Sequence, residues 1–337
     1  MKVLFSRPLT APPGPPPEGF TEIENESSLC TRFGRRFPAV MSDRLAQLQL
    51  ALRLLLFRGR YDVVVTGRYG EMFALLQSLL PFKRPHVLLD VEWFPARRGN
   101  WRNRLNLWTQ RRIASGAQVI QVFCQIAADN YAVHFGIDKS RFYWIPYCCE
   151  TFAPEPQQSA ANFILASGVH HRDYKTLFAA VDGLPIEIRI VAPTSAFAGL
   201  KLPPNVRVLG HLAPESYASV VAASHFIVLS LLPDVMRPAG VITYVTAMQA
   251  GKCVVVNDRP GAGSYIEHGK TGYLVDAADP TALRKQICAL LDSPEAVARV
   301  GRQAAYEARR KFSPEAYFAA VLEAARQASA TSTARGT

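Results

Sequence analysis

The sequence predicts an α/β protein made of two doubly wound domains that face each other across a cleft. Predicted strands alternate with predicted helices twice along the chain, and a Pro- and Gln-rich stretch at residues 151–161 separates the two series. Strands separated by helices indicate parallel sheets with helices on both faces. The 337 residues, 49% of them hydrophobic, are enough to fill two cores.

The first domain is expected at residues 1–150 and begins with a short buried strand at residues 2–6. Residues 8–20 are rich in Pro and Gly, so we expect a loop there. Leucines at helical spacing predict a helix over residues 43–57, with one apolar side formed by Leu45, Leu48, Leu52, Leu55 and Leu56. A second helix opens near Arg68, and the remaining strands are expected at 61–67, 86–94, 117–124 and 142–146.

The second domain is expected at residues 162–328, after a linker at 151–161. Its strands are predicted at 162–168, 186–193, 206–210, 225–231 and 252–258, and its helices at 174–181, 217–223 and 241–250. Residues 280–328 have a helical pattern that breaks at Ser293-Pro294 and Ser313-Pro314, where the serine can cap a new helix. Residues 329–337 are expected to form a polar, frayed tail.

Composition narrows the class of protein. No run of 18 apolar residues is present, and the N-terminal segment lacks the features of a secretory signal, so we expect a cytoplasmic protein without a membrane span. The six cysteines form no CxxC pair and no zinc-ligand spacing, so we expect reduced, mostly buried thiols and neither a metal site nor a redox motif. The adjacent pair Cys148-Cys149 is interpreted as two packed thiols.

The charge is unevenly placed. The chain carries a formal net charge of +11, and its first 150 residues hold 20 basic and 12 acidic side chains. Such a field suits a polyanionic partner: nucleic acid, an anionic membrane surface or a phosphate-bearing substrate. Because no nucleic-acid-binding signature is present, a nucleic-acid-binding protein is the least favoured of these.

An anion site is predicted after the first strand of the second domain, in the segment GVHHRDYKTL at residues 168–177. Ligands of open α/β sheets bind beyond the carboxyl ends of the strands. Gly168 permits a tight turn, Arg172 and Lys175 are cationic, and a helix starts near Tyr174, which suits a diphosphate. The alternative is an ordinary capped turn with solvated charges. His170 and His171 contact phosphate or sugar in the first interpretation and have a structural role in the second.

Two further segments follow later strands: SLLPDVMRPAGVITYVTAMQAGKCVVVND from Ser230, and RPGAGSYIEHGKTGYLVDAADPTAL from Arg259. Together with GVHHRDYKTL and HFGIDKSRFYWIPYCCE before the linker, they resemble the retaining, nucleotide-sugar-dependent glycosyltransferases of the GT-B fold, specifically the large family four. The resemblance covers most of the second domain and scattered parts of the first.

The sequence departs from that family at its pair of glutamates eight residues apart, of which the second precedes an Ala-Met dipeptide. Pro238 and Thr246 occupy these positions. In the family the second glutamate holds the ribose and the first lies near the donor sugar. The stretch PAGVIT resembles a variant subgroup, which implies that Gly240, Val241, Ile242 and Thr243 present backbone N–H groups to the donor.

The resemblance implies a hexosyltransferase that moves a sugar from a nucleoside diphosphate donor to a hydroxyl acceptor, with retention of configuration. The acceptor class it implies is a glycan or lipid-linked intermediate of bacterial-type surface polysaccharide synthesis. The nucleotide-sugar is a co-substrate, and neither cofactor nor metal is expected, since Arg172 and Lys175 would hold the diphosphate. The rival interpretation is a GT-B protein that binds the sugar nucleotide but has lost catalysis. The sugar, the base, the oligomeric state and the catalytic base are not encoded in any motif.

The acceptor is expected on the first domain. Candidates are the Pro-rich loop after Ser6, the turn from Thr66 through Arg68 to Glu71, and the acidic pair Asp90 and Glu92, one of which would accept the acceptor hydroxyl's proton. The alternative for each carboxylate is a hydrogen-bonded residue at a strand end.

The stretch ARRGNWRNRLNLWTQRRI is basic and contains no acidic residue. Its apolar residues Trp101, Leu105 and Trp108 recur at helical spacing beside Arg97, Arg98, Arg102, Arg104, Arg111 and Arg112. Basic helices with Trp and Leu on one face bind anionic interfaces, so we expect a peripheral membrane surface at the cytoplasmic leaflet. The alternative is a helix that packs its tryptophans inward and solvates its arginines.

Overall fold

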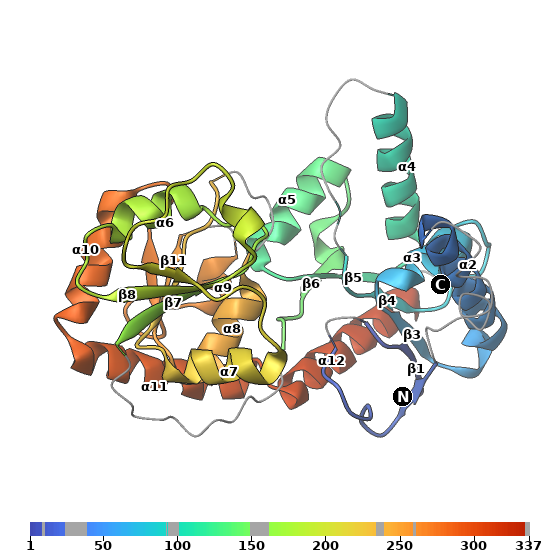
Figure 1. Cartoon of the computed structure of the whole chain (residues 1–337). Helices are drawn as coiled ribbons and strands as arrows, with labels where there is room; N and C mark the ends of the chain where they lie inside the picture. Colours follow the sequence, from blue (N-terminus) through green and yellow to red (C-terminus); the bar gives the residue numbers. More distant parts are fainter. Residues whose placement is uncertain are drawn as a thin grey trace. The chain divides into compact units, whose positions relative to one another are not determined.

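The computed structural model describes residues 1–8, 11–23, 39–91, 93, 101–148, 162–233, 239–258 and 261–333; the side chains of residues 39–43, 68 and 333 are not described. The chain divides into two compact units, Met1–Pro146 with Tyr317–Thr337, and Tyr147–Ala316. Each unit contains one six-stranded sheet in which every pairing is parallel (Figure 1). The predicted α/β class with two Rossmann-like domains is therefore confirmed.

The first sheet has the strand order β2-β1-β3-β4-β5-β6. Its strands are β1 (Val3–Ser6), β2 (Phe20–Glu22), β3 (Val63–Thr66), β4 (His86–Leu88), β5 (Val119–Val122) and β6 (Phe142–Trp144). The helices between them are α2 (Ala39–Phe57), α3 (Glu71–Ser78), α4 (Trp101–Ser115) and α5 (Gln125–Phe135). Strand β2, which pairs with β1, begins at the end of the segment expected to be a loop, and three residues are too short a pattern to predict.

Helix α2 forms where it was expected, but its buried side is not the predicted one. Leu45, Leu48, Leu52 and Leu56 are 40%, 40%, 51% and 78% exposed. The buried side contains Leu50, Ala51 and Leu54, which pack with β1, β3 and α3. Because both sides of this helix are apolar, periodicity alone does not identify the side that faces the core.

The second sheet has the order β12-β11-β10-β7-β8-β9. Its strands are β7 (Phe163–Ser167), β8 (Glu187–Val191), β9 (Val206–Val208), β10 (Ile227–Leu229), β11 (Val254–Asn257) and β12 (Tyr273–Val275). Its helices are α6 (Tyr174–Val181), α7 (Pro214–Ala223), α8 (Val241–Gln249), the short α9 (Ala262–Tyr265), α10 (Pro280–Leu291) and α11 (Pro294–Lys311). Alternate residues of β7 enter two different cores: Ile164 packs with α6 and α10, and Leu165 packs with α8 and α11. Helices therefore cover both faces.

The C-terminal helices break where the sequence predicted. α10 ends at Leu291, α11 begins at Pro294, and α12 (Pro314–Thr333) begins at Pro314. Ser313 caps α12, since its Oγ accepts a hydrogen bond of 3.2 Å from the Ala316 amide. Ser293 occupies the N-cap position of α11 as predicted, but its side chain makes no capping hydrogen bond.

The domain boundary near the C-terminus also differs from the expectation. From Tyr317 onward α12 belongs to the first unit rather than to the second. The Phe318 ring lies 6.0 Å from that of Phe5 and 5.9 Å from that of Phe20, edge on in both cases. Nor is 329 the start of a tail: the helix runs to Thr333, and Ala328 is fully buried. An alanine-rich amphipathic pattern predicts a helix but not which domain it covers.

Among the described residues, no helix combines the length and the apolar character needed to cross a membrane. Cys124, Cys148 and Cys253 are buried, as predicted, whereas Cys288 is partly exposed. Cys30 and Cys149 lie outside the described residues.

Candidate functional site

The predicted anion site lies at the carboxyl edge of the second sheet. Strand β7 ends at Ser167, and Gly168 turns the chain with φ +95°. The Arg172 side chain folds back over this turn: a Cβ placed on Gly168 would lie 2.5 Å from Arg172 Nη2. Glycine is therefore required both by the backbone conformation and by the closeness of the guanidinium.

The Arg172 guanidinium joins the turn to the start of α8. Its Nε donates to the Ser167 carbonyl at 2.7 Å, its Nη1 to the His170 carbonyl at 2.9 Å, and its Nη2 to Thr243 Oγ1 at 3.2 Å. All three acceptors are neutral, and within the described part of the chain no carboxylate pairs with Arg172. Burial lowers the pKa of Arg172 from its ordinary value, although nearby tyrosines oppose this. Among the described residues, the site thus holds a partly buried cation that has no carboxylate partner.

Helix α8 adds to the same positive potential. Gly240, with φ 78°, precedes its first residue Val241, and a Cβ on Gly240 would lie 3.5 Å from Arg172 Nη1. The first amide groups of a helix have no partner within the helix and carry its positive dipole end. Val241, Ile242 and Thr243 supply these amides. An arginine beside a helix N-terminus repels it unless an anion lies between them, which suits a phosphate group.

Three strand ends are tied together around Arg172. Arg172 and Leu231 form an antiparallel bridge, in which the Asp173 amide donates to the Ser230 carbonyl and the Leu232 amide to the His171 carbonyl, both at 2.9 Å. The Leu231 amide donates to Asn257 Oδ1 at 2.6 Å, which adds the end of β11. His171 adopts φ 59° to make this connection.

The hydroxyl of Ser230 is buried and finds no hydrogen-bond partner among the described residues. Ser230 directly follows β10 and lies in the bridge that fixes Arg172. An unsatisfied buried hydroxyl costs free energy unless a ligand or water supplies the missing bond.

Two tyrosines complete the surroundings of Arg172, and sequence reasoning missed both. Tyr174 donates from its hydroxyl to the Gly168 carbonyl, and the Tyr217 hydroxyl lies 3.0 Å from Ser167 Oγ. Burial raises the pKa of Tyr174 to about 12, while the charge of Arg172 acts in the opposite direction. Tyr217 is 50 residues from Ser167, so no local motif connects them.

The remaining predicted donor residues are less closely grouped. Lys175 lies in the first turn of α6 with an exposed side chain, and His170 is also exposed. Thr246 is buried in α8, one turn beyond Thr243. Pro238 lies outside the described residues. The structure therefore brings Gly168, Arg172, Gly240 and Thr243 together and leaves Lys175 without a contact to them among the described residues.

The predicted acceptor residues of the first unit are only partly described. Asp90 is 5% exposed and has φ 56°, and its backbone N–H donates to Gln121 Oε1 at 2.9 Å. Glu71 accepts a hydrogen bond from Trp93 Nε1 at 3.2 Å. Glu92, Arg97, Arg98 and the side chain of Arg68 lie outside the described residues.

Helix α4 forms as expected, and it does not pack its tryptophans inward. Trp101, Leu105 and Trp108 are 69%, 53% and 51% exposed, whereas the buried residues are Gln110, Ile113 and Ala114. Arg102 lies over the Trp101 ring and Arg112 over the Trp108 ring, each at 5.6 Å from the centroid. The alternative interpretation of this segment is thereby wrong.

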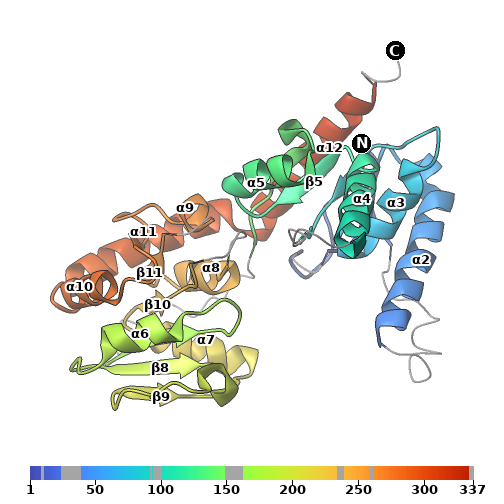
Figure 2. The same cartoon turned by 90° about the horizontal axis from the view of Figure 1, so that it is seen from above.

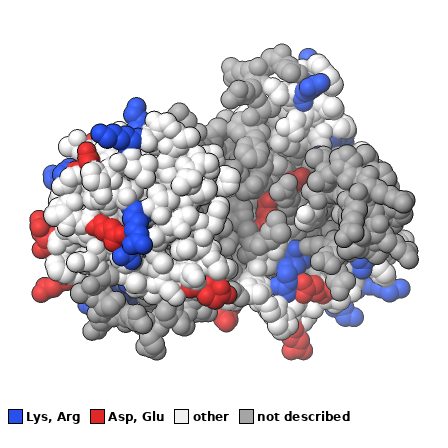
Figure 3. All heavy atoms as spheres, in the orientation of Figure 1, with Lys and Arg blue, Asp and Glu red and all other residues white. Residues whose placement is uncertain are grey.

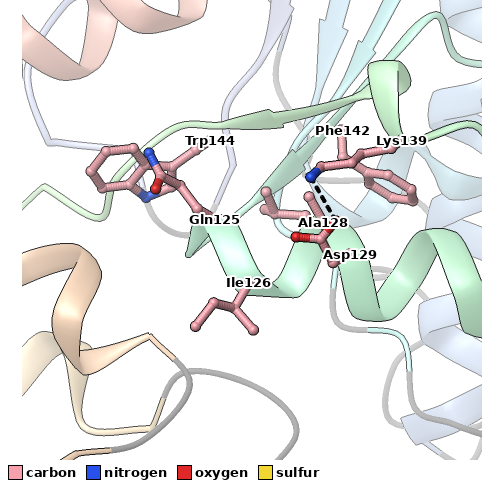
Figure 4. A pocket seen from close by; sticks show the side chains of 8 residues that line it. Gln125, Ile126, Ala128, Asp129, Lys139, Phe142 and Trp144 are labelled. Carbon is pink, nitrogen blue, oxygen red and sulfur yellow. Dashed lines mark ion pairs between the residues drawn. The ribbon is translucent and has the colours of Figure 1, made fainter.

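The first unit also has a surface pocket of about 470 Å³ between α5 and the edge strand β6 (Figure 4). The ion pair of Lys139 and Asp129, 2.6 Å long, lies on one side, and Gln125 and Trp144 lie on the other. It contains none of the predicted site residues. No group of three His, Cys, Asp or Glu side chains within the described ranges could hold a metal ion.

Comparisons with known proteins give one family match and several structural neighbours. Residues 173–293 match the family described as glycosyl transferases group 1. No curated protein matches the chain. Among solved structures, HepE (Alr3699) of Anabaena in complex with UDP has a TM-score of 0.69 at 18% identity, covering 96% of this chain and 99% of that one. HepE was also solved with UDP-glucose, at a TM-score of 0.64, 18% identity and coverage of 99% and 100%.

Two other structures have similar scores. A glycosyltransferase from Rickettsia africae has a TM-score of 0.68 at 13% identity, with 97% and 98% of the two chains covered. Sucrose-phosphate synthase from Thermosynechococcus elongatus has a TM-score of 0.68 at 18% identity, with 98% and 89% covered. This chain therefore has the GT-B fold, and its match to glycosyl transferases group 1 supports a GT-B glycosyltransferase.

Proposed function

We propose that this protein transfers a sugar from a nucleoside diphosphate-sugar to a hydroxyl acceptor, with the diphosphate bound between Arg172 and the start of α8. One observation carries the proposal: the Arg172 guanidinium is partly buried, hydrogen-bonds to neutral acceptors alone among the described residues, and lies beside a helix N-terminus. An anion there satisfies both positive groups. The UDP and UDP-glucose complexes of HepE, which has the same fold, support this class of ligand.

In the proposed reaction the bond between the sugar C1 and the diphosphate oxygen breaks, and the electron pair stays on the diphosphate. The acceptor oxygen forms the new bond to C1 and loses its proton. Arg172 and the amides of Val241, Ile242 and Thr243 stabilise the charge that develops on the leaving group. We propose retention of configuration, as the resemblance to family four implies. We also propose a reaction that needs no metal, because cations and helix dipoles supply the stabilisation of the leaving group.

The proposed acceptor is a hydroxyl of a glycan or lipid-linked intermediate of surface polysaccharide synthesis, met at the cytoplasmic face of a membrane. Its support is the exposed, basic and tryptophan-bearing face of α4 in the first unit. Asp90, two residues after the end of β4, remains the candidate for accepting the proton of the acceptor hydroxyl.

Isothermal titration calorimetry with UDP, GDP, ADP and their glucose conjugates tests the donor assignment. We expect one nucleotide to bind, Arg172→Gln to weaken that binding about 10- to 100-fold, and Lys175→Ala to change it little, because Lys175 is exposed and lies outside the Arg172 contacts. Unchanged affinity in a folded Arg172→Gln protein contradicts the assignment.

A second function is favoured by one observation: Thr246 is buried at the position of the family's ribose-binding glutamate, so the site lacks that carboxylate. A protein that binds the sugar nucleotide without turning it over fits this departure. The test is to incubate the protein with the donor in the absence of acceptor and to measure free sugar. Release of free sugar indicates an enzyme, and an intact bound donor indicates a binding protein.

A further inference from the structure

The outer side of α2 is a stripe of exposed leucines. Leu45, Leu48, Leu52 and Leu56 are separated by three, four and four residues, which places them along one side of the helix. All four are at least 40% exposed. Exposed apolar residues are ordinary when scattered singly, but a continuous row along a helix marks an interaction surface.

The stripe is not needed for the core. The opposite side of α2 already buries Leu50, Ala51 and Leu54 against Leu4 and Phe73. A soluble surface helix normally carries polar residues on its outer side. The leucines of the stripe therefore face away from the core of their own unit, and a hydrophobic environment outside it would accommodate them.

The elements beside α2 also carry exposed apolar residues. α2 packs against α3, and α3 packs against α4 (Figures 1 and 2). Leu79 and Phe82, just after α3, are 62% and 83% exposed. With the exposed face of α4 (Trp101, Leu105 and Trp108), these residues and the leucine stripe form what we call the α2–α4 surface.

The charges on the helices of this surface are mostly basic. Basic side chains outnumber acidic ones on the described helices and the turns that follow them: Arg44, Arg53, Arg58, Arg60, Lys83, Arg84, Arg102, Arg104, Arg111 and Arg112. The acidic residues there are Asp43 in α2, Asp62 just before β3, and Glu71 in α3, which is bonded to Trp93; α4 contributes none. In Figure 3, basic side chains lie over α4.

We propose that the α2–α4 surface docks on an anionic lipid bilayer, with the leucine stripe and the tryptophans in the acyl-chain boundary and the arginines at the phosphates. Leu and Trp flanked by Arg is the composition of helices that lie in a membrane interface. A second copy of the chain fits less well. A symmetric dimer presents the same patch twice, so it would bring ten basic residues of each copy together.

This inference deepens the proposed function, since it names the surface by which the protein would reach a lipid-linked acceptor. It does not use the donor site. Membrane binding and nucleotide binding are therefore measured separately. Absence of vesicle binding would refute the membrane proposal alone, and absence of nucleotide binding would refute the proposed function alone.

The experiment is sedimentation of the full chain with sucrose-loaded vesicles of phosphatidylcholine alone and of phosphatidylcholine with 30% phosphatidylglycerol. We expect binding to the anionic vesicles that falls as salt rises. Leu48→Gln/Leu52→Gln should lower the partition coefficient roughly tenfold or more at every salt concentration, because two side chains no longer enter the apolar region. Arg102→Gln/Arg104→Gln should lower it mainly at low salt.

The matched control is Val133→Gln on α5, which removes an apolar side chain that is 86% exposed outside the surface. It should bind vesicles like the unchanged protein, and all variants should bind UDP or the nucleotide identified by calorimetry equally well. Two results overturn the proposal. One is equal vesicle binding by the leucine variant and the control. The other is a dimer in analytical ultracentrifugation that only the leucine variant dissociates, since that result assigns the surface to a second copy.

Discussion

Replacing Gly168 by Ala should damage the anion site through a single methyl group. Two effects add. An alanine at φ +95° is strained by about 1–3 kcal/mol, and its Cβ would lie 2.5 Å from Arg172 Nη2, so the guanidinium must move. With the loss of one or two hydrogen bonds from Arg172, we expect the free energy of unfolding to fall by about 2–4 kcal/mol.

The displaced guanidinium would no longer face the α8 N-terminus. Losing one charge-assisted contact to a diphosphate costs about 1.5–3 kcal/mol, or roughly a 10- to 100-fold weaker Kd. The matched control is Gly183→Ala, where φ is +71° but no atom lies within 4 Å of the new Cβ. That variant should lose about 1–2 kcal/mol of stability and keep its nucleotide affinity.

The assays are urea unfolding for stability and calorimetry with the nucleotide for affinity, both on Gly168→Ala and Gly183→Ala. The reasoning fails if the two variants lose the same stability and both keep full affinity, because the position of Arg172 would then be irrelevant to binding. It also fails if Gly183→Ala alone weakens binding.

Three further outcomes are expected. Thr243→Val removes the hydroxyl that accepts from Arg172 Nη2 at 3.2 Å, and should weaken nucleotide binding about 2- to 10-fold in calorimetry; no change would mean that Arg172 needs no support from α8. Burial lowers the pKa of His86 to about 3. Between pH 6.5 and pH 3 the unfolded chain therefore binds a proton at this histidine that the folded chain does not, and the free energy of unfolding decreases as the pH falls. Urea unfolding should show a loss of about 2 kcal/mol from this group between pH 7 and pH 5 that is absent in His86→Gln, and an equal slope in both proteins would refute it. Sugar transfer should survive EDTA, whereas complete loss of activity that manganese restores would show a metal-dependent reaction.

The sequence predicts the parts of the site that are local in the chain. Gly168 and Arg172 follow one strand, and Gly240 to Thr243 open one helix, so a strand-to-helix turn with a cation is visible as a pattern. The long-range contacts are not visible. Asn257 holds the Leu231 amide, and Tyr217 reaches Ser167 over 50 residues, because the parallel sheet brings its strand ends to one edge.

The fold was predicted equally unevenly. The parallel sheets follow from the repeated strand and helix patterns. The side of α2 that is buried does not, because the exposed Leu48 and Leu52 have the same spacing as the buried Leu50 and Leu54. Hydrophobic periodicity identifies a face only when the opposite side is polar. α12 poses a related problem, since its pattern predicts a helix and leaves open which core receives Phe318.

The path of α12 has a consequence for how the chain folds during synthesis. The first unit is discontinuous in sequence, so the ribosome synthesises its last helix only after the whole second unit. Until then, the Phe5 and Phe20 rings lack the Phe318 ring that packs on them. The first unit therefore cannot be completed on the ribosome until the second unit has been synthesised, in contrast to the usual order in which the N-terminal domain is finished first. For the same reason, a fragment of residues 1–146 should aggregate, and addition of a peptide of residues 314–333 should restore its solubility.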